Sequence, residues 1–104
     1  MDEYELLVGE WEMSLRAQRK SPKTIKAYRD SALAFRESLV AGGASTDVRE
    51  ITRAQVEAHI VALLERWSET TAATRYRCLQ QWFRFLVENE EIVPSPMRLS
   101  LIHI

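Results

Sequence analysis

Apolar residues recur every three or four positions along most of this chain, which is the spacing of one face of an α-helix. Four such stripes follow one another: Tyr4, Leu7, Trp11 and Leu15; Ile25, Tyr28, Ala32, Phe35 and Leu39; Val56, Ile60, Leu63 and Trp67; and Ala72, Tyr76, Leu79, Phe83 and Leu86. Very little in the pattern favours a strand. Because such helices bury their apolar faces only against one another, the sequence predicts an all-α fold, a compact four-helix bundle with these residues as its core.

Local signals predict where the helices begin and end. Ser21 is a good N-cap, and Pro22 suits the first helical position because it has no N–H to leave unsatisfied. Gly42-Gly43 can end this second helix in the left-handed conformation. Two side chains fall outside the stripes: we expect Trp82 to pack on a partner and Cys78 to lie at the helix surface or its boundary.

The third and fourth helices have start signals of their own. Thr52 and Gln55 have the spacing of a capping box, so the third helix should start there and stop near Trp67. The fourth helix has three possible caps, Ser68, Thr70 and Thr71. Pro94 and Pro96 forbid its extension. We therefore expect one domain over residues 1–93 and the start of a linker over residues 94–104.

Charge is unevenly distributed along the 104 residues, although 14 basic residues nearly balance 15 acidic ones. Five bases and one acid lie between Lys20 and Arg36, and three bases and no acid lie between Thr70 and Val87. Two basic segments are thus available to a polyanionic partner. A hydrophobic content of 46% is enough for one modest core and a single domain.

Other classes of site find little support. One cysteine allows no internal disulfide and no cysteine-rich zinc site, which fits a reducing cytoplasm. His59 and His103 lack metal-ligand spacing, so we expect no metal and no cofactor. No apolar run approaches the length that spans a bilayer, so we expect a cytoplasmic protein without a membrane partner.

The starts of the second and fourth helices have the residue types of a phosphate clamp. A helix N-terminus offers free N–H groups and the positive end of the helix dipole, and nearby hydroxyl and basic side chains strengthen anion binding. The residues expected to contact DNA are Lys20, Ser21, Lys23, Thr24 and Lys26 on the second helix, and Thr70, Thr71, Thr74, Arg75, Arg77 and Gln81 on the fourth. The lysines suit phosphates, whereas Arg77 and Gln81 suit base edges in a major groove.

These motifs carry a resemblance to a known family. Ser21, Pro22, Thr24 and Tyr28 match a Ser-Pro-x-Thr-x-x-x-Tyr opening, and Thr52 and Val56 match a Thr-x-x-x-Val helix. Thr71, Thr74-Arg75 and Trp82-Phe83-Arg84-Phe85-Leu86 occupy the places of a final helix that has a Ser/Thr-rich start, an Arg pair and an aromatic end. From about Tyr4 to Met97 the chain resembles the N-terminal, SAM-like core-binding domain of tyrosine recombinases of the phage-integrase and Xer kind. It departs from the family pattern at Glu69, Thr74 and Ser95.

The resemblance implies a four-helix SAM-like fold and binding to duplex DNA at a recombination half-site. In that family a following catalytic domain supplies an Arg, a Lys, a His-x-x-Arg, a further His or Trp and a nucleophilic Tyr, and the parent forms a homo-tetramer in the synaptic complex. None of those motifs is recognisable here, and Tyr4, Tyr28 and Tyr76 fall in helices of the binding domain. We therefore expect a chain that binds DNA for recombination and integration and is not itself an enzyme.

Two other functions and one unusual segment stay open. The bundle could be a helical protein-interaction or adaptor module whose basic faces are only solvated, or a small stand-alone DNA-binding regulator. Residues 99–104 look like the translation of a transposase mosaic-end adapter used in library preparation, so we expect a non-native tail. A genuine apolar tail that packs on the bundle is the alternative.

Overall fold

Four α-helices account for most of residues 1–92, the part of the chain that the structure, a computed structural model, describes. They are α1 (Glu3–Ala17), α2 (Pro22–Ala41), α3 (Arg53–Arg66) and α4 (Glu69–Glu88), and a 3₁₀ turn, η1 (Val48–Glu50), precedes α3. These residues contain no strand, and the predicted all-α fold is confirmed. The expected linker and tail, residues 94–104, lie outside the described residues.

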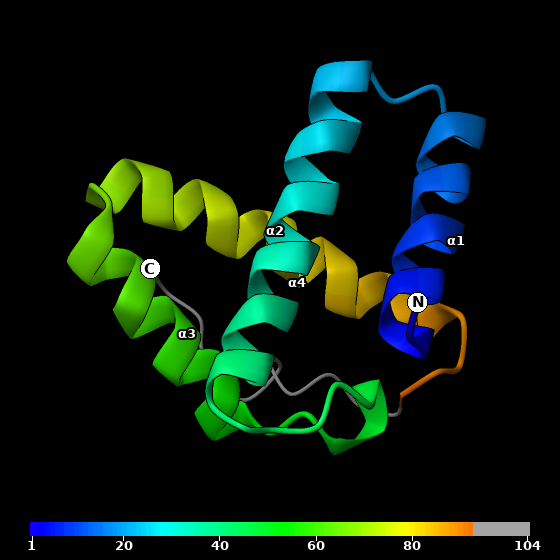
Figure 1. The fold of residues 1–104 in the computed structure, drawn as a ribbon. Coiled ribbons are helices and arrows are strands. Elements are labelled where there is room, and N and C mark those ends of the chain that lie inside the picture. The colour runs from blue at the N-terminus through cyan, green and yellow to red at the C-terminus, as the bar shows by residue number, and fades with distance from the viewer. Residues whose placement is uncertain (93–104) are drawn as a thin grey trace.

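The helices form two crossed pairs. In Figure 1, α1 and α2 lie side by side and run in opposite directions, and α4 passes behind α2. α3 packs against α4 and the end of α2, away from α1. The start of α2 and the start of α4 therefore lie at separate places on the molecule.

The helix boundaries have the local causes that the sequence indicates. The hydroxyl of Ser21 accepts a hydrogen bond from the Thr24 N–H at 3.1 Å, with proline in the first position of α2. Gly43, with φ of 71°, adopts the left-handed conformation just after α2. The capping box of α3 is complete: the Thr52 hydroxyl accepts from the Gln55 N–H at 3.2 Å, and the Gln55 side chain accepts from the Thr52 N–H at 2.8 Å.

Aromatic rings join α1, α2 and α4 at the centre of the core. The Trp82 ring lies 5.3 Å from the Tyr4 ring, 5.2 Å from the Trp11 ring and 6.0 Å from the Phe85 ring. Trp82 has no exposed surface, so the expectation that it packs on a partner is wrong. Because α4 is covered on one side by α2 and on another by α1, its buried arc is wider than a single stripe.

Two further expectations about side-chain position are wrong. Cys78 is buried and not at the helix surface, because it lies within the same widened arc of α4. Trp67 is 40% exposed although it continues the apolar stripe of α3. Its backbone is extended, with φ of −123° and ψ of 166°, so the helix has already ended and the side chain leaves the buried face.

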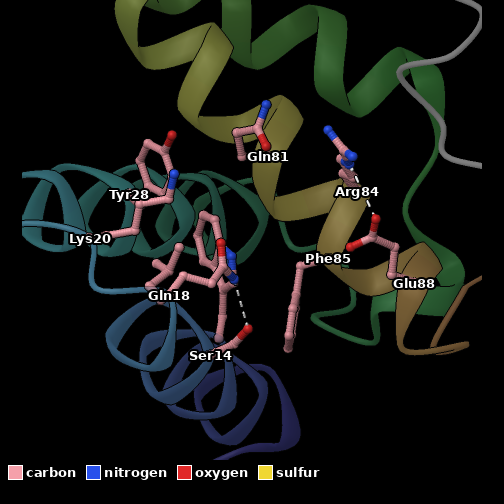
Figure 2. A pocket seen from close by; sticks show the side chains of 10 residues that line it. Ser14, Gln18, Lys20, Tyr28, Gln81, Arg84, Phe85 and Glu88 are labelled. Carbon is pink, nitrogen blue, oxygen red and sulfur yellow. Dashed lines mark hydrogen bonds and ion pairs between the residues drawn. The ribbon is translucent and has the colours of Figure 1, made fainter.

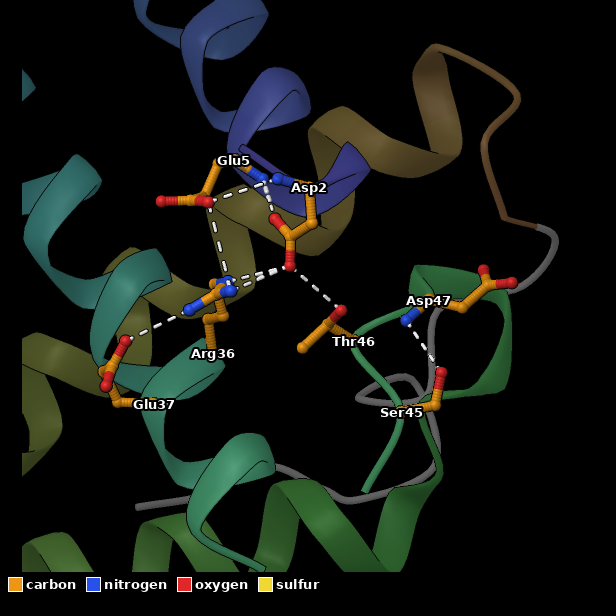
Figure 3. Close-up of polar contacts among 7 residues, drawn as sticks. All are labelled: Asp2, Glu5, Arg36, Glu37, Ser45, Thr46 and Asp47. Atoms are coloured by element: carbon orange, nitrogen blue, oxygen red, sulfur yellow. Dashed lines mark hydrogen bonds and ion pairs between the residues drawn. The ribbon is translucent and has the colours of Figure 1, made fainter. Parts of the chain in front are cut away.

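A polar cluster joins the N-terminus of α1 to the C-terminal half of α2 and to the segment that follows α2. Asp2 caps α1 and also accepts hydrogen bonds from the Arg36 guanidinium at 2.9 and 3.0 Å and from the Thr46 hydroxyl at 3.1 Å (Figure 3). Arg36 lies on α2, and Thr46 lies in the segment that leads to η1. Three segments of the chain thus meet at one carboxylate.

Candidate nucleic-acid interface

The start of α2 presents basic side chains around a satisfied cap. Ser21 and Thr24 bond each other twice, since the Ser21 hydroxyl also donates to the Thr24 hydroxyl at 3.0 Å. Lys20 and Lys23 are exposed and form no ion pair within residues 1–92. Lys26 differs, because its ammonium group binds the Asp30 carboxylate at 2.7 Å. This bond keeps the pKa of Asp30 below its usual value.

The start of α4 repeats the same cap. The Ser68 hydroxyl accepts from the Thr71 N–H and donates to the Thr71 hydroxyl, both at 3.2 Å. Among the three possible caps, Ser68 is the one that the structure uses. Thr70 is left exposed, and its carbonyl accepts a hydrogen bond from the Thr74 hydroxyl at 3.0 Å.

Exposed polar residues form a continuous line along α4. Thr74, Arg77 and Gln81 are all exposed, and the Arg77 guanidinium donates to the Thr74 hydroxyl at 3.4 Å. The same spacing of three and four residues continues after Gln81 to Arg84 and Glu88, which were not among the contacts expected from the sequence. We call this line the polar stripe of α4; its members are Thr70, Thr74, Arg77, Gln81, Arg84 and Glu88, all exposed. Spacings of three and four along one helix place them on one face.

Arg75 lies away from the polar stripe and has a different partner. Its guanidinium lies 5.2 Å from the centre of the Trp67 ring, and Arg66 lies at the same distance from that ring. Burial, together with the positive charge of Arg75, lowers the pKa of His59 to about 4. His59 is therefore neutral at pH 7, with its ring edge-on to Phe35 at 5.2 Å.

One residue from each group of expected contacts, Lys20 and Gln81, lines a pocket of about 240 Å³ between α1, α2 and α4. Figure 2 shows side chains from α1 and α2 on one side of it and side chains from α4 on the other. The lining residues are Trp11, Ser14, Leu15, Gln18, Lys20, Tyr28, Gln81, Arg84, Phe85 and Glu88. Lys20 and Gln81 are thereby brought together, while the caps at Ser21 and Ser68 stay apart.

Comparison with known proteins identifies the family. A family model described as phage integrase, N-terminal SAM-like domain, matches residues 8–90. The chain belongs to the phage integrase N-terminal SAM-like domain family. The match confirms the SAM-like fold inferred from the sequence motifs.

One relative of this integrase domain is a longer protein named as a recombinase. The chain is 28% identical over 95 residues to a protein named tyrosine recombinase XerC from Pediococcus pentosaceus. The similarity covers 89% of this chain and 32% of that protein, so the chain spans less than half the length of its relative. No solved structure matches the chain at a significant level.

Other kinds of site are not evident in the part of this integrase domain that the structure describes. Residues 1–92 contain no group of three or more His, Cys, Asp or Glu side chains placed to hold a metal ion. None of the helices within these residues combines the length and the apolar character that crossing a membrane requires.

Sequence reasoning omitted Arg84 and Tyr28 from the candidate site. The signal for Arg84 was present, because it lies three residues after Gln81 and so continues the exposed face. Tyr28 is on the apolar stripe of α2 and was assigned to the core. In the structure it is half-buried, and its ring stacks on Trp11 at 5.3 Å with 14° between the planes.

Proposed function

We propose that this chain binds duplex DNA as the core-binding domain of a site-specific tyrosine recombinase or integrase. The polar stripe of α4 is the observation that carries the proposal: five exposed polar side chains and one carboxylate follow one helix face that has no covering element in residues 1–92. Membership of the integrase family and the similarity to a tyrosine recombinase support the same function.

In this proposal the start of α2 contacts the DNA backbone and α4 contacts the bases. Lys20 and Lys23 contact phosphates and fix the register of the domain on the duplex, while Arg77 and Gln81 reach base edges. Lys26 and Arg75 contribute less, since Asp30 engages the former and the Trp67 ring covers the latter. Thr24, Thr70 and Thr71 complete the set as hydroxyl donors near phosphate. The hydroxyls of Ser21 and Thr74 already donate to Thr24 and to the Thr70 carbonyl, so they contribute to the interface only as acceptors.

The phosphodiester chemistry of the parent recombinase belongs, in this proposal, to its catalytic domain. The binding domain comprises residues 1–93, and the linker follows from residue 94. Assembly of a homo-tetramer on the recombination site is a property of the complete parent protein, and the mass of its DNA complex in solution tests it.

The experiment is a measurement of duplex affinity as a function of salt, using fluorescence anisotropy on a labelled duplex. The logarithm of the affinity should fall linearly with the logarithm of salt concentration, and each lost phosphate contact should lower the slope by about 0.9. We expect the double variant Lys23→Ala/Arg77→Ala to bind more weakly and with a smaller slope.

The matched control is Arg49→Ala/Arg53→Ala, which removes the same charge around η1 and the start of α3, far from the start of α2. It should change affinity little. Absence of duplex binding by the wild-type chain at low salt would contradict the proposal. A protein-interaction module, with Val61 and Leu64 exposed on α3, would then be the better account.

A further inference from the structure

The pocket between α1, α2 and α4 has a composition that suits one particular ligand. We propose that it receives a single backbone phosphate of the bound duplex, held between Lys20 and Arg84. The inference rests on the proposed DNA-binding function and goes beyond it by assigning a specific ligand group to a specific pocket.

Charge in the pocket favours an anion. Lys20 and Arg84 contribute two positive charges, and Glu88 contributes one negative charge. The Arg84 Nε already binds the Glu88 carboxylate at 3.2 Å, which holds the guanidinium in place and partly neutralises the carboxylate. Within residues 1–92 the terminal nitrogens of Arg84 have no further acceptor. A guanidinium fork with free terminal nitrogens matches the geometry of phosphate oxygens.

A neutral donor and a rigid floor complete the pocket. The Tyr28 hydroxyl can donate to a phosphate oxygen, as Tyr does in many DNA complexes. Stacking on Trp11 fixes the Tyr28 ring, so little ordering is needed on binding. Trp11 and Phe85 are buried aromatic residues beneath the polar rim, and an apolar floor strengthens the attraction between charges.

The position of the pocket agrees with the rest of the proposed interface. Gln81 and Arg84 are consecutive members of the polar stripe of α4, and Lys20 directly precedes the cap of α2. A phosphate bound here would therefore lie where the contacts of α2 and those of α4 converge (Figure 2).

The test compares Lys20→Ala, Arg84→Ala and the double variant in the salt titration, with an unmodified duplex of arbitrary sequence. If both cations hold one phosphate, each single variant binds more weakly, and the double variant loses about 0.9 from the salt slope, the value of one phosphate contact. A slope that does not change overturns the proposal. A loss of twice that value also overturns it, because the two side chains would then contact separate phosphates.

Arg53→Ala is the matched control for Arg84→Ala. Arg53 pairs with Glu57 through Nε at 3.2 Å, four residues apart, which repeats the Arg84–Glu88 geometry on α3 outside the pocket. It should leave the salt slope unchanged. Lys20, Arg53 and Arg84 are all exposed, so we expect the variants to fold, and circular dichroism checks this.

The outcomes separate this inference from the function on which it rests. If the wild-type chain does not bind the duplex at low salt, both the DNA-binding function and the phosphate pocket are wrong. If it binds, and Lys23→Ala/Arg77→Ala weakens binding while Lys20→Ala/Arg84→Ala does not, the phosphate pocket and the phosphate contact of Lys20 are wrong, and DNA binding through Lys23 and Arg77 stands. As a second measurement, the NMR signals of the Tyr28 ring and the Trp11 indole, both of which line the pocket, should shift when duplex is added, and unmoved signals would contradict the assignment.

Discussion

Asp2 shows how much one side chain can stabilise in a domain of this size. It accepts a hydrogen bond from the Glu5 N–H at 2.9 Å as the cap of α1, and it binds Arg36 and Thr46 through its other oxygen. The hydrogen bond from Arg36 is the largest of the effects that lower the pKa of Asp2 to about 2. The folded state therefore stabilises the ionised carboxylate.

The first prediction concerns the pH dependence of this contribution, with Asp2→Asn as the variant. Asn caps a helix about as well as Asp, so the substitution mainly removes the ion pair and should cost about 1 kcal/mol at pH 7. Because the pKa of Asp2 is lower in the folded chain than in the unfolded one, the difference between wild type and variant should be complete above about pH 4. It should disappear as the pH falls towards 2.

Urea unfolding at several pH values measures that difference. Glu57→Gln, which removes the carboxylate of an ion pair that is about half exposed on both sides, is the control and should change the free energy of unfolding much less. A cost of Asp2→Asn that stays constant down to pH 2 would show that the Arg36 contact contributes nothing through the charge of Asp2.

At the scale of elements, the two serine caps are the features that decide where α2 and α4 begin. Both hydroxyls accept from the N–H of a threonine three residues later, at 3.1 Å in α2 and 3.2 Å in α4. Sequence identified Ser21 because a proline follows it. At α4 three hydroxyl residues lie within four positions, and only the backbone conformation of Ser68, with φ of −64° and ψ of 160°, distinguishes the cap.

The second prediction compares Ser68→Ala with Thr70→Ala. Loss of the Ser68 cap should lower the free energy of unfolding by about 1 kcal/mol, because the Thr71 N–H loses its acceptor. Thr70 is exposed inside the helix, and alanine is the better helix former, so Thr70→Ala should be neutral or slightly stabilising. Thermal and urea unfolding of the two variants tests this order, and equal costs would mean that the hydroxyls share the capping role.

What the sequence predicts well is local, and what it misses depends on packing between elements. Caps and helical periodicity depend on residues within one or two turns, so four helices and most of the core were predictable. The burial of Trp82 depends on two helices covering α4 from different sides, and the exposure of Trp67 depends on where α3 ends. The pocket joins Lys20 to Arg84 across three helices, which no spacing along the chain encodes.

On the scale of the whole molecule, the core is unevenly shared among the helices. α1, α2 and α4 meet in the aromatic cluster around Trp82. From α3, Val56 and the half-buried Ile60 reach the same core, while Val61 and Leu64 stay exposed. Local stability follows the buried apolar contacts of each segment, so α3 should be the helix that opens most easily.

Hydrogen exchange tests this unequal stability, and α1 offers the matched comparison because it has 15 residues against 14 in α3. Five residues of α1 lie in the main core: Tyr4, Leu7, Val8, Trp11 and Leu15. We expect amides in the middle of α3 to exchange about tenfold faster than those in the middle of α1, equivalent to about 1.4 kcal/mol of opening free energy. Equal protection would instead make the four helices one cooperative unit. α3 leads directly into the Ser68 cap, so opening of α3 would also release the start of α4. If the polar stripe of α4 forms the interface, bound duplex should therefore slow hydrogen exchange in α3.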